Sequence, residues 1–362
     1  MKRLALTLPF AALMLNPAAV GAEDAAPDDR TRWWGHVQVL AGDDMEGRGT
    51  GTPGYDRAAD YVIGAFQSLG LKPMGTDGYK QPVAFVEQII RSDSSSAVLL
   101  GSGGESPLSV PGDLIFSGGG GPVPERIDAS MVFAGYGLHL PEEGHDDFAG
   151  LDLQGKVVVV VSGGPATISG ALKSHARSER AQYLASKGAV GLISLVTPRQ
   201  VEIPWKRRVN LAGAPALYYA DAALRESDRP FLNAQIDPAR SQSVFEGSGH
   251  DFAAIAAAAD ASAPIAGFPL AQRLSARVAA TRRNLSSPNL IAVMPGSDPN
   301  LRDEYVVLSA HLDGYGIGTP VKGDAIYNGA FDNASGVASV LEIARANRPD
   351  PFDLYYRRDE PL

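Results

Sequence analysis

The chain has 362 residues, of which 44% are hydrophobic and 20% charged, and its formal net charge is −9. This composition predicts a globular protein with a substantial core, and the acidic balance disfavours nucleic acid as a partner, because phosphate binding needs clustered Lys and Arg. The sequence contains no cysteine, so disulfides are excluded and any metal site must be built from His, Asp and Glu.

Residues 1–22 have the features of an export signal. Lys2 and Arg3 give a positive start, residues 4–15 are apolar, and Ala22 ends a small-residue cleavage site. The apolar stretch is short for a membrane span, so we expect a cleaved signal peptide and no stable membrane anchor, with an uncleaved anchor as the alternative. Cleavage removes two cations and no acid, leaving a charge of −11 on 340 residues that suit roughly two domains. We expect a periplasmic or secreted protein.

Residues 31–90 predict two helices followed by a strand. Residues 32–40 place Trp33, Val37 and Leu40 on one helical face, and we expect both Trp33 and Trp34 in the core. Residues 55–70 carry a broad apolar stripe that ends at a glycine, and residues 81–90 have the pattern of a strand.

A glycine-dense loop, residues 43–54, separates the two predicted helices. Two interpretations are open: a flexible connector, or a backbone anion cradle that lacks the lysine of a phosphate loop. Glu46 and Arg48 could line a cleft at this loop, but a role in packing the loop is favoured.

The composition changes in residues 91–284, where short apolar runs are separated by Ser-rich and Gly-rich stretches. Residues 157–161, five consecutive valines within GKVVVVV, predict a central strand buried on both faces. Further strands are expected at 189–195, 214–219 and 273–283, and helices at 176–187 and 253–261. This alternation predicts a compact sub-domain inserted into the rest of the chain.

The chemistry is concentrated between Tyr305 and Ala346. Residues 305–308 predict a short buried strand, and His311 and Asp313 follow on the same side of the extended chain. After a glycine-rich loop, Asp332 is expected at the N-cap of a helix, where capping alone would explain an aspartate. A ligating imidazole commonly donates its second N–H to a carboxylate, so the combination of these three residues favours a metal site.

A family resemblance rests on the sequences LSAHLDGYGIG and GDAIYNGAFDNASGVASVLEIARA, and on AGDDMEGRGTGTPGYDRAADYVIGAFQSLGLKP near the amino end. They resemble the two-zinc exopeptidases that include secreted bacterial leucine aminopeptidases. VFAGYGL, DFAGLDLQGKVVVVVSGGP and ASKGAVGLISL resemble the protease-associated domain that many members carry. The resemblance implies peptide or protein substrates.

The resemblance also implies a fold and a site. The implied fold class is α/β, a mixed, mainly parallel sheet flanked by helices, with an inserted α/β protease-associated domain at about residues 130–235. The peptidase domain would comprise residues 23–90 and 285–346. His311 would bind one of two zinc ions, Asp332 would bridge both, and Asp313 would be the catalytic-site carboxylate that orients the histidine.

The sequence departs from the family after Ala346. The family's Glu-Glu pair, a further Asp and a final His do not follow, so the chain lacks the general base and has an incomplete ligand set for two zinc ions. Residues 347–362 resemble an unrelated tail, which predicts a truncated or frameshifted chain. The lost strands would expose Val306 and Leu308, together with the helix face at Val337 and Leu341.

No other residue is expected to replace the missing groups. Glu342 lies ten residues along the helix from Asp332 and is turned away from it. The remaining histidines have weak claims as ligands: His36, His139, His145, His175 and His250. The alternatives to an aminopeptidase are another exopeptidase of the same fold, a glutaminyl cyclase-like enzyme, or a non-catalytic binding module with a vestigial zinc site.

Overall fold

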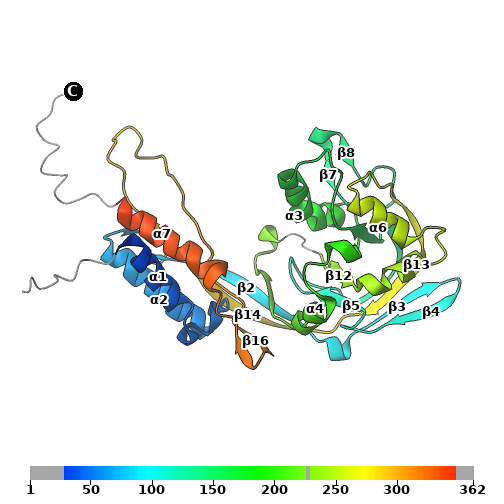
Figure 1. Ribbon diagram of the computed structural model, residues 1–362, viewed down its shortest axis with the longest axis horizontal. Helices are drawn as coiled ribbons and strands as arrows, with labels where there is room; N and C mark the ends of the chain where they lie inside the picture. The colour runs from blue at the N-terminus through cyan, green and yellow to red at the C-terminus, as the bar shows by residue number, and fades with distance from the viewer. Residues whose placement is uncertain (1–27, 226–228, 348–362) are drawn as a thin grey trace, which may run out of the picture.

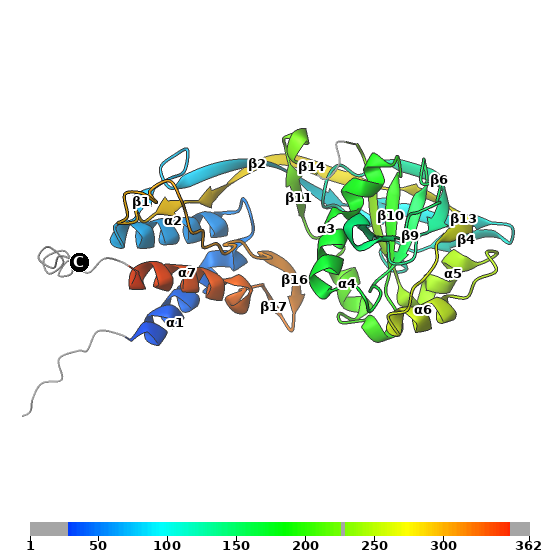
Figure 2. The same ribbon diagram turned by 90° about the horizontal axis from the view of Figure 1, so that it is seen from above.

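In the computed structural model, which describes residues 28–225 and 229–347, the protein forms two lobes joined by a long ribbon of strands (Figure 1). The smaller lobe holds both ends of the described chain and the larger lobe holds its middle (Figure 2). The predicted signal peptide, and the predicted tail from residue 348 onward, lie outside the described residues. Within the two described ranges, no helix is long and apolar enough to cross a membrane.

Three helices build the smaller lobe: α1 (Asp29–Leu40), α2 (Pro53–Ser68) and α7 (Ser335–Ala346). Thr52 caps α2, since its hydroxyl accepts from the N–H of Tyr55, and Pro53 occupies the first turn, where no N–H is needed. The two predicted helices of residues 31–90 are thereby confirmed. Their apolar faces share one core with α7: Val37, Leu40, Ala58, Val62, Phe66, Leu71, Ala334, Val337, Ala338 and Leu341.

The ribbon pairs β2 (Lys80–Ile90) with β14 (Ala280–Leu290) in antiparallel register along their whole length, and β11 (Ala216–Tyr219) adds a third strand to β2. The strand predicted at residues 81–90 is confirmed. Glu87 on β2 accepts two hydrogen bonds, of 2.6 and 2.7 Å, from Arg283 on β14. The chain therefore enters the larger lobe through β2 and returns to the smaller lobe through β14, and these two strands are paired.

The larger lobe is built on an eight-stranded sheet. Its strands, in spatial order, are β4 (Gly104–Leu108), β3 (Ser96–Gly101), β13 (Phe268–Arg277), β6 (Arg126–Phe133), β9 (Val157–Val161), β10 (Gly191–Leu195), β12 (Leu232–Ile236) and β5 (Leu114–Ser117). The four strands from β6 to β12 are parallel, and the outer pairings are antiparallel. The helices of this lobe are α3 (Gly170–Ser186), α4 (Trp205–Leu211), α5 (Ser241–Phe245) and α6 (Phe252–Asp260).

The all-valine strand is the centre of this sheet. Each residue of β9 is at most 1% exposed, because the two faces of the sheet pack against separate apolar clusters. This confirms the prediction of a strand buried on both faces. The α/β class is also confirmed, and the parallel strand pairs of the described residues lie in the larger lobe.

Short antiparallel pairs complete the structure. β1 (Lys72–Pro73) pairs with β15 (Ala292–Val293) in the smaller lobe, and β7 (His139–Leu140) pairs with β8 (His145–Asp146) in the larger one. The hairpin of β16 (Ile317–Val321) and β17 (Asp324–Ile326) projects from the smaller lobe toward α4 (Figure 2). The hydroxyl of Thr319 on β16 donates to the carbonyl oxygen of Asn210 on α4 at 3.2 Å.

Three expectations about packing were wrong. Residues 305–308 form no strand, because no strand of the described residues lies beside them to complete a ladder. Val306 and Leu308 are exposed as expected, at 94% and 50%, but Val337 and Leu341 on α7 are buried in the shared core. Trp34 is 51% exposed. Adjacent residues of a helix point about 100° apart, so Trp34 cannot face the core on the same side as Trp33.

Candidate metal centre

The structure brings His311 and Asp332 together from two separate segments. Nε2 of His311 lies 3.0 Å from Oδ1 of Asp332, and both side chains are about half exposed, at 54% and 64%. Zinc binds imidazole nitrogen and carboxylate oxygen at about 2.0–2.2 Å, so two atoms at this separation can contact the same ion. The pair fits two positions of a metal site that opens toward solvent.

Asp313 lies behind the imidazole, on the opposite ring nitrogen. Nδ1 of His311 is 3.1 Å from the main-chain oxygen of Asp313 and 3.4 Å from its carboxylate Oδ1, so the backbone oxygen forms the better hydrogen bond. An acceptor at Nδ1 favours the tautomer that carries its proton there, which would leave the lone pair of Nε2 available to a metal ion placed between it and Asp332. The hydroxyl of Thr50 donates to Oδ2 of Asp313 at 2.9 Å, and no pattern in the sequence singles out this partner.

Asp332 does not cap α7, contrary to the expectation. The N-cap is Ala334, and the side chain that reaches the free N–H groups is that of Asn333, whose Oδ1 accepts from Gly336 at 3.1 Å. Asp332 sits in the irregular turn Ala330–Ala334 with φ −120° and ψ 88°. Because Asn333 takes the capping role, the carboxylate of Asp332 is left to face His311.

A full ligand set is not assembled by the described residues. No three His, Cys, Asp or Glu side chains of residues 28–225 and 229–347 gather closely enough to hold a metal ion. His311 and Asp332 thus supply two donors of suitable chemistry and spacing, and further ligands would have to come from outside these ranges.

The glycine-dense loop packs against the segments that carry these residues. The N–H of Gly314 donates to Arg48 and that of Gly316 donates to Gly47, each at 3.0 Å, and Gly49 forms a parallel bridge with Gly314. A side chain on Gly47 would lie 2.6 Å from the main-chain oxygen of Gly316, so the close approach requires glycine. The loop is held against these segments by backbone hydrogen bonds, which argues against a flexible connector.

Arg48 is completely buried in this loop. Its Nε donates to the carbonyl oxygen of Leu312 at 2.8 Å, Nη1 donates to those of Leu40 and Asn328, the latter at 2.8 Å, and Nη2 donates to that of Gly329 at 2.9 Å. Burial lowers the pKa of the guanidinium, and the nearby carboxylates of Asp313 and Asp332 oppose that shift. The packing role favoured from the sequence is the one observed.

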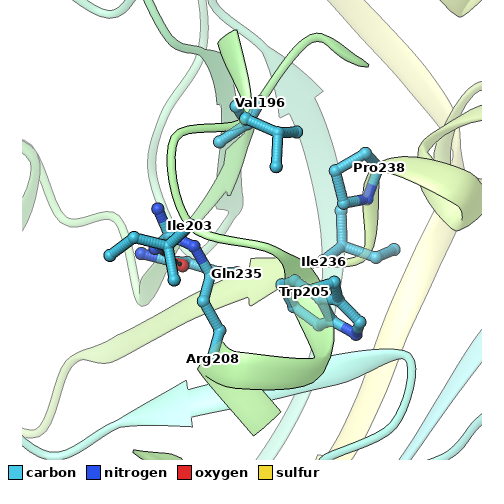
Figure 3. Close-up of a pocket in the computed structure, with 8 residues that line it drawn as sticks. Val196, Ile203, Trp205, Arg208, Gln235, Ile236 and Pro238 are labelled. Carbon is cyan, nitrogen blue, oxygen red and sulfur yellow. Dashed lines mark hydrogen bonds between the residues drawn. The ribbon is translucent and has the colours of Figure 1, made fainter. Parts of the chain in front are cut away.

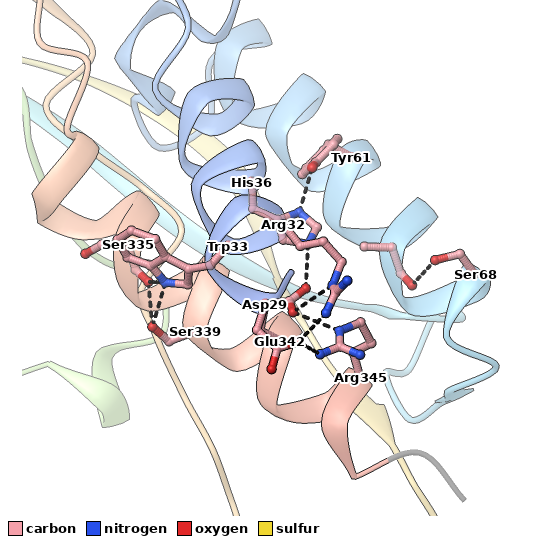
Figure 4. Close-up of polar contacts among 11 residues, drawn as sticks. Asp29, Arg32, Trp33, His36, Tyr61, Ser68, Ser335, Ser339, Glu342 and Arg345 are labelled. Atoms are coloured by element: carbon pink, nitrogen blue, oxygen red, sulfur yellow. Dashed lines mark hydrogen bonds and ion pairs between the residues drawn. The ribbon is translucent and has the colours of Figure 1, made fainter. Parts of the chain in front are cut away.

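Glu342 is engaged far from the candidate centre, as expected. Its carboxylate binds Nε of Arg345 at 2.8 Å and lies 3.5 Å from Nε2 of His36, which joins α7 to α1 (Figure 4). Nδ1 of His36 is 2.7 Å from the hydroxyl of Tyr61 on α2. Both residues therefore hold helices together.

The histidines of the larger lobe also have local partners. His139 and His145 lie within 3.3 Å of Asp146 and Asp147 respectively, and His250 stacks on a phenylalanine ring. A small, mostly apolar pocket in this lobe contains none of the predicted site residues (Figure 3). It is lined by Val196, Val201, Ile203, Trp205, Arg208, Gln235, Ile236 and Pro238.

Comparisons with known proteins single out the segment that carries the candidate centre. Residues 289–353 match the family described as peptidase family M28. A stretch of 75 residues, 21% of this chain, is 40% identical to leucine aminopeptidase 1 of Trichophyton rubrum and covers 18% of that protein.

Two solved structures resemble the chain more broadly. An aminopeptidase from Aneurinibacillus sp. strain AM-1 is 20% identical with a TM-score of 0.39, covering 88% of this chain and 58% of its own. The zinc aminopeptidase BSAP from Bacillus subtilis is 16% identical with a TM-score of 0.38, covering 90% and 59%. The chain thus spans less than two thirds of the length of each of these relatives.

Proposed function

We propose, from the match of residues 289–353 to peptidase family M28, that the whole protein is a zinc-dependent aminopeptidase that removes amino-terminal residues from peptides. The observation that carries the proposal lies inside the matched segment: Nε2 of His311 is 3.0 Å from Oδ1 of Asp332. On the other side of the imidazole, Nδ1 contacts the main-chain oxygen of Asp313, and Thr50 donates to the carboxylate of Asp313.

The chain's own residues have distinct roles in this proposal. His311 and Asp332 hold zinc, Asp313 orients the imidazole, and Thr50 fixes the carboxylate of Asp313. Zinc supplies Lewis acidity, which polarises a peptide carbonyl and makes water easier to ionise near neutral pH. Asp332 is 64% exposed and has a second carboxylate oxygen, so it is the residue that would also reach a second zinc ion. No cluster of three possible metal ligands forms among the described residues, so the remaining ligands would come from outside them.

The proposal extends to the organisation of the chain. We assign residues 23–90 and 285–346 to the peptidase domain, and 91–284 to an insert that contains a protease-associated domain at about 130–235. The contact between Thr319 and Asn210 supports an insert that lies near the site, since β16 follows the His311 segment. The features of residues 1–22 support export to the periplasm or beyond.

The test measures zinc content and hydrolysis of leucine p-nitroanilide on the purified chain. We expect bound zinc in the wild type, and a loss of at least tenfold in zinc affinity in His311→Ala and Asp332→Asn. His175→Ala is the matched control, since His175 is exposed on α3 and pairs with Glu179.

The outcomes separate the proposal from its main alternative. A non-catalytic module with a vestigial site is the second candidate, favoured by the lack of a three-residue ligand cluster among the described residues. Bound zinc together with turnover of the substrate would exclude that candidate. A wild-type chain that neither binds zinc nor cleaves the substrate would defeat the aminopeptidase proposal for these 362 residues.

A further inference from the structure

We propose that Arg48 is a positioning residue for the candidate metal centre, because it sets the separation between His311 and Asp332. The inference rests on the proposed function for its metal, but the geometry that it concerns exists without one. Arg48 touches neither side chain directly, so it acts through the backbone of the segments that carry them.

One guanidinium group joins the two segments. Its Nε binds the carbonyl oxygen of Leu312, the residue between His311 and Asp313, at 2.8 Å. Its Nη1 and Nη2 bind the carbonyl oxygens of Asn328 and Gly329, at 2.8 and 2.9 Å. These two residues lie just before the turn that holds Asp332. The planar group is rigid, so it holds both segments at a fixed distance from each other.

The same group is anchored to the helical core. Nη1 also donates to the carbonyl oxygen of Leu40, the last residue of α1. Four carbonyl oxygens in different directions match the fork of N–H donors that arginine presents. Lysine has its three donors on one nitrogen and cannot reach the same set, so the inference requires arginine specifically.

The local backbone is shaped around this side chain. Glu46, Gly47 and Arg48 have φ values of 48°, 66° and 53°, a conformation that L residues such as glutamate and arginine rarely adopt. Gly329 has no side chain where one would lie 2.8 Å from Nη2 of Arg48. A left-handed turn on one side and a glycine on the other therefore allow the guanidinium to enter between the segments.

A measurement that needs no metal tests the positioning role. The chain has no cysteine, so the pair His311→Cys and Asp332→Cys introduces its only two thiols. The rate at which dibromobimane, a short fluorescent bis-alkylator, bridges them reports their separation. We compare this rate in the Arg48, Arg48→Lys and Arg48→Gln backgrounds, and correct each for the folded fraction from near-ultraviolet circular dichroism.

Arg57→Lys is the matched control. Arg57 belongs to α2 and binds the same loop, through the carbonyl oxygen of Asp44 and the carboxylate of Glu46, but it contacts neither site segment. We expect bridging to slow at least tenfold in both Arg48 variants and to stay within twofold in Arg57→Lys. Bridging within twofold of the parent in either Arg48 variant overturns the inference. So does slowing that only follows the unfolded fraction, because that result would assign Arg48 to stability alone.

Zinc titration of the chain with native His311 and Asp332 gives the second readout. We expect Arg48→Lys to weaken zinc binding by about 10–100-fold, the range seen when groups that support metal ligands are changed. If the wild-type chain binds no zinc, the proposed function fails, whereas the bridging rate still decides the role of Arg48. Unchanged zinc affinity in Arg48→Lys would count against positioning.

Discussion

Asp332 and Asn333 have different roles: Asn333 caps helix α7, and Asp332 faces His311. An aspartate just before a helix is ordinarily its cap, and here the amide of Asn333 accepts the hydrogen bond from Gly336 instead. The carboxylate of Asp332 is consequently held 3.0 Å from the imidazole of His311. Helix capping therefore does not explain the aspartate at position 332, which strengthens its interpretation as a metal ligand.

Thr50 is the side chain whose role becomes visible only in three dimensions. We expect Thr50→Val, which keeps the shape and removes the donor, to weaken zinc binding about tenfold by loosening Asp313 behind the imidazole. Thr319→Val is the control, because the hydroxyl of Thr319 binds Asn210 and does not reach the centre. Isothermal titration with zinc measures both variants, and equal affinities for the two would refute the role of Thr50.

At the scale of elements, α7 connects the candidate centre to the helical core. Its buried face contacts α1 and α2, and its polar edge carries Glu342, whose side chain is only 12% exposed. Arg32, His36 and Arg345 surround that carboxylate. The arrangement joins two helices that are about 300 residues apart in sequence.

Glu342→Gln should separate stability from metal binding. The substitution keeps the shape but removes the charge that faces three basic side chains, so we expect Tm to fall by about 2–4 °C. Zinc affinity should be unchanged, since Glu342 does not face His311. Glu179→Gln, in an exposed pair with His175, is the control and should leave Tm unaltered. A changed zinc affinity in Glu342→Gln would show that this carboxylate serves the centre after all.

At the scale of the whole molecule, the two lobes have separate apolar cores connected by the β2–β14 ribbon. Leu341 belongs to the core of the smaller lobe and Leu99 to that of the larger one, and each is at most 1% exposed. No apolar cluster of the described residues includes members of both lobes. We therefore expect the lobes to unfold in two distinguishable calorimetric transitions.

Core truncations assign these transitions. Leu341→Ala should lower the midpoint temperature of one transition and Leu99→Ala that of the other. Each substitution should reduce the free energy of unfolding of its own lobe by about 2–5 kcal/mol. Zinc should raise the midpoint temperature of only that transition which Leu341→Ala affects, because a ligand stabilises the unit that binds it. EDTA should reverse this shift. If both substitutions move a single transition, the two lobes fold as one cooperative unit.

Features that depend on local residue pattern could be predicted from the sequence. The helices α1 and α2 follow from apolar spacing, Pro53 and Gly70, and the valine strand β9 follows from a run with no polar face. The residues His311, Asp313 and Asp332 were also identified from sequence, through their order and their family resemblance, and the structure brings them together.

Features that depend on residues distant in sequence could not be predicted in this way. Residues 305–308 have the composition of a strand, but a strand needs a neighbour for its hydrogen bonds, and none of the described strands lies beside them. The burial of Val337 and Leu341 depended on α1 and α2 covering α7. The roles of Thr50 and Arg48 likewise arise from contacts across more than 260 residues of sequence, which local pattern does not encode.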